Sequence, residues 1–528
     1  MLPSARRGAS TIPMLLSLDR KGSVPLHRQI YLAFRRAILD ARFPAGRRLP
    51  STRALALDLG VSRTTVLGAY DQLAAEGFLK SHAGGGSRVA SATPPILDRG
   101  GAASHRRAGR TVAPQNEPRR SRPIPAVQPK LSVGGLAYIG VDGWSGRGTP
   151  SSTAAASMAR GRCVPFVLGV PALDSFPVRT WARLTARQWR RNPRNLMLPD
   201  DGAGYRPLRE AIAEYAYTAR GVRCTADQVI VTAGAIQGIA LAARLLLDRG
   251  DQVWMEEPGF SPARAAFTAV GAAVLPVPVD QEGLDVTFGL GVAPKARMAF
   301  VTPSFQAPMG TIMSLARRLA LLDWAASAGS WVIEDDYNGE FRYDGRPLSS
   351  MQGLEHPGAG QVIYLGTFSK TIFPALRLGY IVVPPGYGDA FSRARLSMDR
   401  HSPVAEQAVL ADFIQEGHFA RHVRAMRRLY QERQERFVAL ARRELGDSMI
   451  VEPAPSGMRL LGWLPPGVSD VRVADLAASR GIDVLPLSRL CLSRPPRNAL
   501  LLGYVPFSHS ETERGLRTLA QCLRSSEA

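Results

Sequence analysis

The chain has 528 residues, an apolar content of 45% and a formal net charge of +22 at pH 7, which predict a cytoplasmic protein of two to four domains with a large core. Neither a membrane span nor a secretory signal is expected, because no apolar run reaches roughly 18 residues and the N-terminus lacks a charged-then-apolar order. A metal site and a disulfide framework are not expected either, because the cysteines are far apart in sequence: Cys163, Cys224, Cys491 and Cys522.

The positive charge is concentrated at the start of the chain. Residues 1–130 hold 22 lysines and arginines against 7 aspartates and glutamates, a surplus of 15. A solvated basic face or an arginine-rich linker would explain part of this surplus. A polyanionic partner explains more of it, because clustered lysines and arginines are the electrostatic footprint of nucleic-acid binding.

The first predicted element follows a leader, residues 1–22, that we expect to be poorly ordered. From Leu26 to Ile38 apolar residues recur every four positions, which predicts a helix with one buried face. This helix opens a small domain that we place at residues 23–90.

Two more helices are expected in this domain. Ser51 or Thr52 can cap a second, short helix that ends at Gly60, and Ser62 can cap the third. The residues that the first turn of the third helix leaves exposed, where a recognition helix contacts DNA, are Arg63, Thr64 and Thr65.

A β-hairpin over residues 78–89 completes the domain and carries Arg88. The series resembles the winged helix-turn-helix of GntR-type regulators, and a generic three-helix bundle is the alternative. The resemblance is carried by the motifs Leu49-Pro50-Ser51-Thr52-Arg53, Gly60-Val61-Ser62-Arg63-Thr64-Thr65-Val66 and Ala69-Tyr70. It implies double-stranded DNA as a partner, and the residues expected near phosphates or base edges are Arg47, Ser51, Arg53, Ser62, Arg63, Thr64, Thr65 and Arg88.

Residues 91–162 lose hydrophobic periodicity and are rich in Pro, Arg, Gly, Ser and Ala, which predicts a flexible basic linker. Its arginines either add sequence-independent affinity for DNA or only keep the linker extended.

Residues 163–528 show short apolar strands that alternate with amphipathic helices. This alternation predicts an α/β domain with a mainly parallel sheet, and a small α+β subdomain is expected from Met449 to the C-terminus. The strands expected in the large sheet are residues 229–232, 252–256, 298–302, 331–335, 362–366 and 379–383.

One stretch of this domain has the residues to bind a phosphorylated aldehyde. Lys370 follows a buried strand, lies among small hydroxyl residues and precedes Arg377 by seven positions. A lysine in such a setting can form a Schiff base, while Thr367, Ser369 and Arg377 hold the phosphate. The ordinary alternative is that Lys370 and Arg377 are solvated loop charges.

The stretch from Val362 to Tyr380 closely resembles the cofactor-lysine motif of fold-type I aminotransferases, in the variant found in MocR-subfamily regulators of the GntR family. The resemblance implies that pyridoxal 5'-phosphate (PLP) forms an aldimine with Lys370. It also implies a homodimer.

The same resemblance assigns upstream residues to the cofactor. The backbone amides of Ala235 and Ile236, at a helix start after a glycine turn, would bind the phosphate. Phe260 would lie against the pyridine ring, with plain core packing as its alternative. The amide of Gln306 would approach the ring hydroxyl.

A pair of acids ends the strand over residues 331–335. Asp335 would lie beside the ring nitrogen, because a protonated pyridine makes the ring an electron sink. Tyr337 would hydrogen-bond to the ring hydroxyl. We interpret Asp336 as a helix cap or a residue of a solvated turn.

The chain departs from amino-acid aminotransferases at the substrate side. Leu501 lies where those enzymes hold the substrate carboxylate with an arginine, and the loss of such a charge-assisted hydrogen bond costs roughly 1.5 to 3 kcal/mol. Arg264 or Arg459 could compensate, but we expect both at the surface. Efficient transamination of a standard α-amino acid is therefore not expected.

These observations predict a multidomain protein: an N-terminal winged helix-turn-helix (α+β), then an α/β fold-type I PLP-dependent aminotransferase-like domain. We interpret it as a PLP-dependent transcriptional regulator of MocR type that senses an amine, an amino acid or PLP itself and controls promoter binding. Two alternatives stay open. One is an active aminotransferase that carries a DNA-binding domain, and the other is a DNA-binding protein whose large domain is a dimerisation scaffold without a cofactor.

Overall fold

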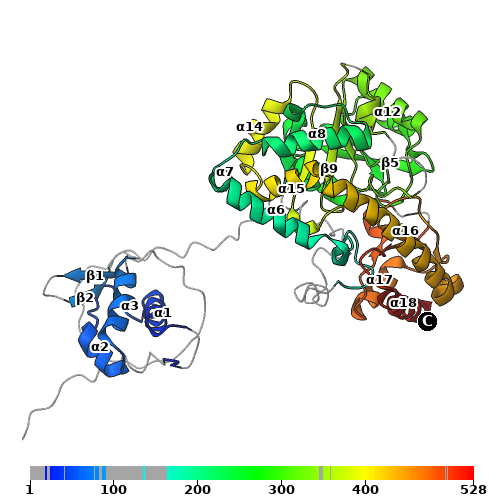
Figure 1. Ribbon diagram of the computed structural model, residues 1–528. Helices are drawn as coiled ribbons and strands as arrows, with labels where there is room; N and C mark the ends of the chain where they lie inside the picture. Colours follow the sequence, from blue (N-terminus) through cyan, green and yellow to red (C-terminus); the bar gives the residue numbers. More distant parts are fainter. Residues whose placement is uncertain are drawn as a thin grey trace, which may run out of the picture. The chain divides into compact units, whose positions relative to one another are not determined.

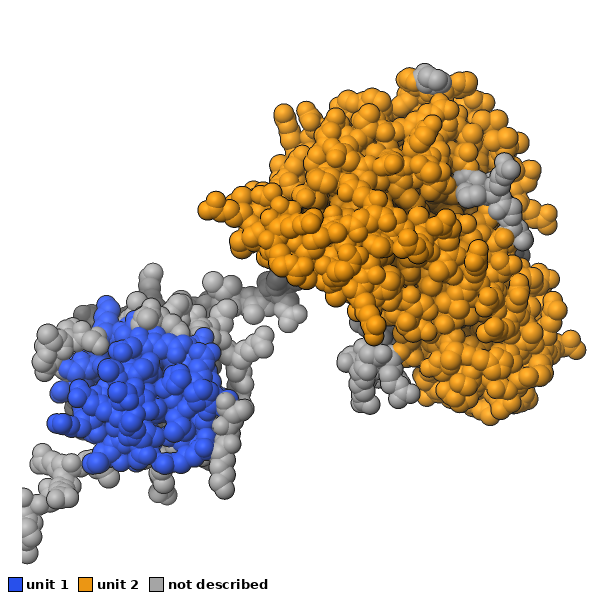
Figure 2. Space-filling model, in the orientation of Figure 1, with its two compact units in different colours: residues 1–124 blue, residues 125–528 orange. Residues whose placement is uncertain are grey.

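The computed structural model divides into two compact units, residues 1–124 and 125–528, which Figure 2 shows in different colours. Most of the expected leader and of the expected linker lies outside the described residues. The residues that the structure describes are 18–20, 24–40, 42–75, 78–82, 86–90, 132, 134, 136, 163–343, 349–356, 358–493, 495 and 497–527.

The described residues of the first unit form three helices and a β-hairpin (Figure 1). Its elements are α1 (Leu26–Leu39), α2 (Thr52–Leu59), α3 (Arg63–Ala75), β1 (Leu79–His82) and β2 (Gly86–Val89). Phe34 of α1, Leu55 of α2 and Val66 of α3 are buried in one apolar core, as the sequence periodicity predicted.

Local sequence sets the ends of α2 and the pairing of the hairpin. The Ser51 hydroxyl caps α2 by accepting a hydrogen bond from the Ala54 amide at 3.1 Å, and Gly60 ends the helix at a φ of 60°, which favours glycine. β1 and β2 pair antiparallel. The amide of Leu49 also donates to the Ser87 carbonyl at 2.9 Å, so the chain before α2 is fastened to β2.

The second unit is built on an eight-stranded sheet with the order β3-β10-β9-β8-β7-β4-β5-β6. Its strands are β3 (Val229–Thr232), β4 (Gln252–Glu257), β5 (Ala273–Asp280), β6 (Gly283–Leu284), β7 (Met298–Val301), β8 (Trp331–Asp335), β9 (Val362–Thr367) and β10 (Gly379–Val382). The five strands from β9 to β5 are parallel to one another, whereas β10 is antiparallel to both its neighbours. The mainly parallel sheet that the sequence predicted is confirmed.

Helices pack on this sheet and keep most of its strands out of water. The helices of the large subdomain are α6 (Val178–Arg191), α7 (Pro193–Met197), α8 (Arg206–Arg220), α9 (Ala235–Leu246), α10 (Ser261–Ala269), α11 (Val286–Val292), α12 (Leu315–Ala328), α13 (Met351–Leu354), α14 (Gly388–Met398) and α15 (Val404–Gln415). Every residue of β3, β7, β8 and β10 is buried. Strands that are covered on both faces have continuous runs of apolar residues, which is why the sequence predicted them.

A small α+β subdomain follows the long helix α16 (His418–Leu445), which leads from the large subdomain toward α17 (Asp470–Ser479) and α18 (His509–Glu527) in Figure 1. Its four-stranded antiparallel sheet has the order β11-β12-β14-β13. The strands are β11 (Ile450–Val451), β12 (Arg459–Trp463), β13 (Leu485–Pro486) and β14 (Ala499–Gly503).

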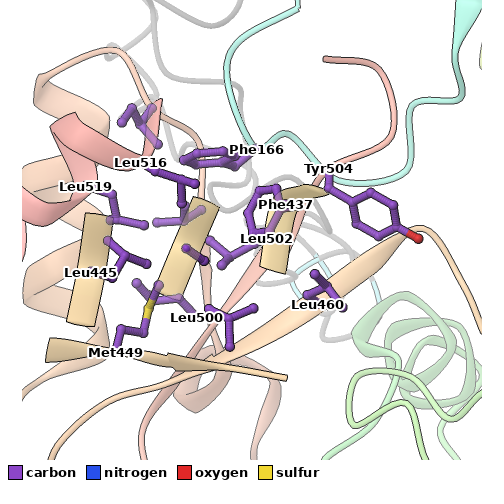
Figure 3. Close-up of a cluster of buried hydrophobic side chains, with 14 of the residues drawn as sticks. Phe166, Phe437, Leu445, Met449, Leu460, Leu500, Leu502, Tyr504, Leu516 and Leu519 are labelled. Carbon is purple, nitrogen blue, oxygen red and sulfur yellow. The ribbon is translucent and has the colours of Figure 1, made fainter. Parts of the chain in front are cut away.

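The stretch around Phe166, at the start of the continuous described part of the second unit, belongs to this small subdomain. Phe166 is fully buried there and packs edge-on against Phe437 of α16, with ring centroids 5.6 Å apart (Figure 3). Its carbonyl accepts a hydrogen bond from the Gly503 amide at 2.9 Å, and a Cβ on Gly503 would lie 2.1 Å from the Val167 carbonyl oxygen. The chain therefore crosses β14 in close contact, which the sequence prediction of a subdomain starting at Met449 did not include.

The strand end that carries the two acids is fixed by a buried ion pair. Asp336 is 3% exposed, so its interpretation as a cap or solvated turn is wrong. Arg220 Nε donates to its Oδ2 at 2.5 Å, and the Tyr364 hydroxyl donates to the same oxygen at 2.7 Å. Arg220 Nη2 also donates to Ser304 Oγ at 2.7 Å. These contacts tie α8, β8 and β9 together behind Asp335.

Replacement of this arginine should destabilise the second unit strongly. Arg220→Met leaves the Asp336 carboxylate buried without its cation, and the free energy of unfolding measured by urea denaturation should fall by about 3 to 5 kcal/mol. Arg206→Met is the control, because the Arg206–Glu210 pair is about half exposed and should contribute little. Equal losses for the two variants would contradict a structural role for the buried pair.

Candidate cofactor site and nucleic-acid interface

A cavity of about 440 Å³ lies where β8 and β9 end and where α9 begins. The sequence-predicted cofactor residues that line it are Ala235, Ile236, Phe260, Asp335, Tyr337, Thr367, Ser369, Lys370 and Arg377. These residues come from stretches up to about 140 positions apart in the chain. They meet here because the carboxyl ends of parallel strands lie at one edge of the sheet.

One end of the cavity is built to hold an anion. α9 begins at Ala235 after Gly234, whose φ of 108° is open to glycine and closed to most residues. A Cβ on Gly234 would lie 3.6 Å from the guanidinium nitrogens of Arg377, so the arginine lies beside the helix start. Free amides, the helix dipole, an arginine and the hydroxyls of Thr367 and Ser369 are the groups that bind phosphate in proteins.

The buried end of the cavity offers an acceptor for a cationic N–H group. Asp335 is 3% exposed, and among the described residues its Oδ1 has no hydrogen-bond partner. Burial, and then the nearby Asp336 and Glu256 carboxylates, raise the pKa of Asp335 to about 8, while Lys370 opposes the shift. A protonated pyridine nitrogen would give Oδ1 a donor and hold the carboxyl group ionised, so the residues present fit PLP.

Lys370 lies on the wall of the cavity, partly buried. Its Nζ donates a hydrogen bond to the Gly169 carbonyl at 3.1 Å. Loss of hydration, followed by the positive charge of Arg459, lowers the pKa of Lys370 from 10.5 to about 8. In a substantial fraction of molecules Lys370 is therefore a neutral amine near physiological pH, and the neutral amine is the form that attacks an aldehyde.

Gly169 is a residue that the sequence interpretation missed. It has a φ of 75°, and a Cβ at this position would lie 2.3 Å from the Lys370 Nζ. Only the sequence Gly169-Val170-Pro171 marks a turn here. That signal does not reveal a partner 201 positions away.

Gln306 lies elsewhere than the sequence expectation placed it. Its side-chain amide nitrogen donates to Glu256 Oε2 at 3.1 Å and to the Pro258 carbonyl at 2.9 Å. Its Oε1 accepts from the Met309 amide at 2.8 Å. Because this amide group is occupied in fastening two loops, the neighbouring Ala307 lines the cavity instead.

On the substrate side, Arg459 differs from the expectation, whereas Leu501 does not. Arg459, expected at the surface, is 5% exposed, and its Nη2 donates to the Gln306 carbonyl at 3.0 Å. Its guanidinium lies 5.0 Å from the ring centroid of Phe305 and 5.6 Å from that of Tyr337. Leu501 is fully buried in an apolar cluster with Leu168 and neighbouring leucines.

The predicted DNA contacts of the first unit fall into three groups. Arg53, Arg63 and Thr64 have exposed side chains on α2 and at the start of α3. Ser62 Oγ, in contrast, caps α3 by accepting a hydrogen bond from the Thr65 amide at 3.1 Å, as Ser51 does for α2.

The side chains of two predicted arginines contact the loop between α1 and α2. Arg47 stacks on Phe43 with its guanidinium 4.6 Å from the ring centroid. Arg88 Nη1 donates to the Gly46 carbonyl at 3.0 Å. Both side chains are therefore held by the fold at the edge of the hairpin.

Two other kinds of site are absent from the described residues. None of their helices is both long and apolar enough to cross a membrane. Across the same ranges, no group of three or more His, Cys, Asp and Glu side chains could hold a metal ion.

Comparison with known families matches both units. Residues 26–89 match the model of bacterial regulatory proteins of the gntR family, and residues 166–495 match that of aminotransferase class I and II. The second match covers more than half of the chain.

Individual relatives show the same combination. The chain is 39% identical to the probable rhizopine catabolism regulatory protein MocR of Rhizobium meliloti, over 97% of each chain. It is 32% identical to the HTH-type transcriptional regulator YhdI of Bacillus subtilis (strain 168), over 95% of this chain and 96% of that one. Among solved structures it is similar to LysN, an α-aminoadipate aminotransferase of Thermus thermophilus, with a TM-score of 0.65 and 28% identity over 71% of this chain and 95% of that chain.

The lowered pKa of Lys370 predicts how PLP loading depends on pH. The amine is protonated below about pH 8 and neutral above it, so the loading rate measured by stopped-flow absorbance should rise up to about pH 8 and level off beyond it. Free Nα-acetyl-lysine is the control, because its rate should still rise near pH 10. A protein profile that keeps rising to pH 10 would contradict the shifted pKa.

Proposed function

The chain belongs to the MocR-type transcriptional regulators, which join a gntR-family helix-turn-helix to an aminotransferase class I and II domain, and we propose that it senses a small molecule at a Lys370-bound PLP and adjusts its promoter binding. The observation that carries this proposal is the cavity in which Lys370, Asp335 and Arg377 meet the start of α9. The helix-turn-helix makes DNA the partner of the other unit.

Each cavity residue has a proposed role toward the cofactor. Arg377 and the amides at the start of α9 hold the phosphate, with Thr367 and Ser369. Asp335 holds the proton of the ring nitrogen. Bound PLP supplies an aldehyde carbon that exchanges one amine for another and a ring that withdraws electrons.

The remaining aromatic residues hold the ring in place. Phe260 lies along the cavity wall and is proposed to contact the face of the ring. Tyr337 is proposed to donate its hydroxyl proton to the ring oxygen, since burial raises its pKa to about 12 and keeps it protonated. Gln306 is left out of this set, because its amide fastens the loops behind the cavity.

The contact between Lys370 and Gly169 offers a route from the cavity to the DNA-binding unit. Gly169 lies six residues after Cys163, where the continuous described part of the second unit begins and the expected linker ends. An effector amine that takes the place of Lys370 at the cofactor would change the N–H groups that Lys370 has available for its hydrogen bond to the Gly169 carbonyl. The position of the chain segment that leads to the helix-turn-helix then depends on the occupant of the cavity.

We infer that the regulator works in the cytoplasm as a homodimer. Two winged helices bind repeated half-sites better than one, because each adds its own phosphate contacts. Exposed apolar side chains support an interface on the second unit: Met197 is 66% exposed, Leu198 60% and Ile236, on the cavity wall, 44%.

Turnover as an aminotransferase is the weaker interpretation of the same cavity. By the resemblance to aminotransferases, Leu501 lies where an arginine would bind the substrate carboxylate, and this leucine is packed among apolar residues. Steady conversion of an amino donor to its keto acid, abolished by Lys370→Ala, would favour the enzyme over the regulator.

The role of Lys370 is tested by the visible spectrum of the purified protein. With added PLP the parent should gain an absorption band near about 420 nm, and PLP should change its affinity for operator DNA. Lys370→Ala should show neither effect, whereas Lys295→Ala, which removes an exposed lysine, should show both. Absence of the band in the parent under saturating PLP would refute cofactor binding and leave an inert scaffold.

The role of α3 is tested by an operator selected from random duplexes with the parent protein. Arg63→Ala should weaken binding to this operator by about 1 to 3 kcal/mol and relax the base preference at one position of each half-site. Arg36→Ala removes an equal charge from a different helix, α1, and should leave the preference unchanged. Uniform weakening over all sequences, with a lower salt slope, would instead assign Arg63 to a phosphate.

A further inference from the structure

We propose that an arginine-rich surface of the second unit, on α6 and α7, binds the phosphate backbone of the DNA that flanks the operator. This arginine face consists of Arg179, Arg183, Arg187, Arg190, Arg191 and Arg194. The inference rests on the DNA binding of the helix-turn-helix. It goes beyond the proposed function, because it gives a second DNA contact to the unit that holds the cofactor cavity, and it does not depend on PLP.

The positive charge of the second unit is local. Residues 163–528 have a formal net charge of +5, whereas α6 and α7 together hold six arginines and no acid. The rest of these residues therefore has a net charge of −1. A basic stretch of helix on a nearly neutral unit is the pattern expected of a surface that binds a polyanion.

The arginines of α6 share one side of the helix. Intervals of three or four residues return to the same face, and the arginines so spaced are Arg179, Arg183, Arg187, Arg190 and Arg191. Like charges at an interval of four repel one another and destabilise a helix. On α18, by contrast, Glu513 pairs with Arg517 at this interval. A bound anion would relieve the repulsion on α6.

Acids of α15 and its C-terminal end neutralise only the middle of the arginine face. Arg187 Nη2 donates to Asp412 Oδ2 at 2.7 Å and also to Glu416, which fastens α6 to α15. Arg183 Nη2 lies 3.9 Å from Glu416 Oε2. The arginines that are exposed and have no ion-pair partner among the described residues are Arg179, Arg190, Arg191 and Arg194.

The positive surface continues on α16. Exposed arginines recur there at intervals of three and four: Arg421, Arg424 and Arg428. One imidazole joins the two helices, because Arg183 Nη2 lies 3.4 Å from His418 Nε2 and Arg421 Nη1 lies 3.3 Å from Nδ1 of the same ring. The arginine face is therefore extended by further arginines on this side.

The dimensions of the arginine face suit duplex DNA. From Arg179 to Arg191 the helix rises about 18 Å, at about 1.5 Å per residue. This length corresponds to about five base pairs, at about 3.4 Å each. A guanidinium group binds phosphate oxygens through two parallel hydrogen bonds. The face thus spans several phosphates of one strand.

DNA is the polyanion that this chain keeps within reach. The described part of the helix-turn-helix domain ends at Ala90 and the continuous second unit begins at Cys163, so 73 positions separate them. A flexible chain of that length has an end-to-end distance of roughly 45 Å, or about 13 base pairs. A duplex held by the helix-turn-helix therefore presents its flanks to the second unit at a high effective concentration.

The test compares two duplexes that contain the operator selected with the parent protein. The short duplex has about 25 base pairs, enough for two half-sites, and the long one adds about 25 base pairs at each end, beyond the reach of the linker. In fluorescence anisotropy at low salt, the full-length parent should bind the long duplex about 10-fold more tightly, because additional phosphate contacts release counterions.

A triple variant removes the positive charge from one end of the arginine face: Arg190→Gln, Arg191→Gln and Arg194→Gln. It should lose the gain on the long duplex and bind the short duplex as the parent does. Its salt slope on the long duplex should fall by about 3, one for each phosphate contact removed. The matched control removes three exposed arginines elsewhere on the unit and should keep the gain: Arg244→Gln, Arg249→Gln and Arg297→Gln.

The outcomes separate this inference from the proposed function. If the parent selects no operator, the DNA binding of the proposed function fails and the arginine face fails with it. If the triple variant unfolds in urea at the parent's midpoint, which shows that it is folded, an undiminished gain on the long duplex overturns the arginine face alone. Equal binding of both duplexes by the parent, or an equal loss of the gain in the control, would overturn it as well.

A membrane surface is the other polyanion that the test distinguishes. Sedimentation with phosphatidylglycerol vesicles is measured for the parent and the triple variant. Vesicle binding that the triple variant loses, together with equal affinity of the parent for the two duplexes, would assign the arginine face to lipid and overturn the DNA contact.

Discussion

The need to neutralise carboxylates buried at the end of β8 is the constraint on which the second unit depends. Asp335 and Asp336 are consecutive and both almost fully buried, where an unpaired charge is costly. The two carboxyl groups differ in how this cost is met. Asp336 has a permanent cation in Arg220, which braces the strand end, whereas Asp335 faces a cavity and Lys370. The buried Arg220–Asp336 pair thus supports the neighbouring Asp335, whose carboxyl group faces the cavity and can bind a ligand.

The sequence predicted correctly those features that depend on residues close together in the chain. The helix-turn-helix follows from caps and periodicity within about 65 residues, and the large sheet follows from apolar runs that are buried on both faces. Asp335 ends such a run and Lys370 follows one, and both lie in motifs that resemble those of aminotransferases. The role of Arg220 was not predicted, because its partner Asp336 lies 116 positions away and nothing near an arginine in a helix marks it as buried.

The sequence-based errors share a cause. Gln306 was assigned to the ring by the resemblance of its segment to aminotransferases, but the direction of its amide is decided by Glu256, 50 positions earlier. Arg459 was placed at the surface because most arginines are there. Its burial follows from the packing of the small sheet against the large subdomain, where it meets the ring of Phe305. Side-chain direction depends on tertiary partners, and a single sequence does not show these.

The chain segment around Phe166 bears on how such regulators can be recombined. This segment lies at the start of the second unit's continuous described chain, yet its ring lies in the core of the C-terminal subdomain and its continuation supplies the Gly169 carbonyl to Lys370. A chimera that joins this sensor to another DNA-binding domain must therefore place its fusion point before residue 163. A junction at the start of α6, the first long helix in the described part of this unit, would remove a core aromatic residue and the carbonyl that accepts from Lys370.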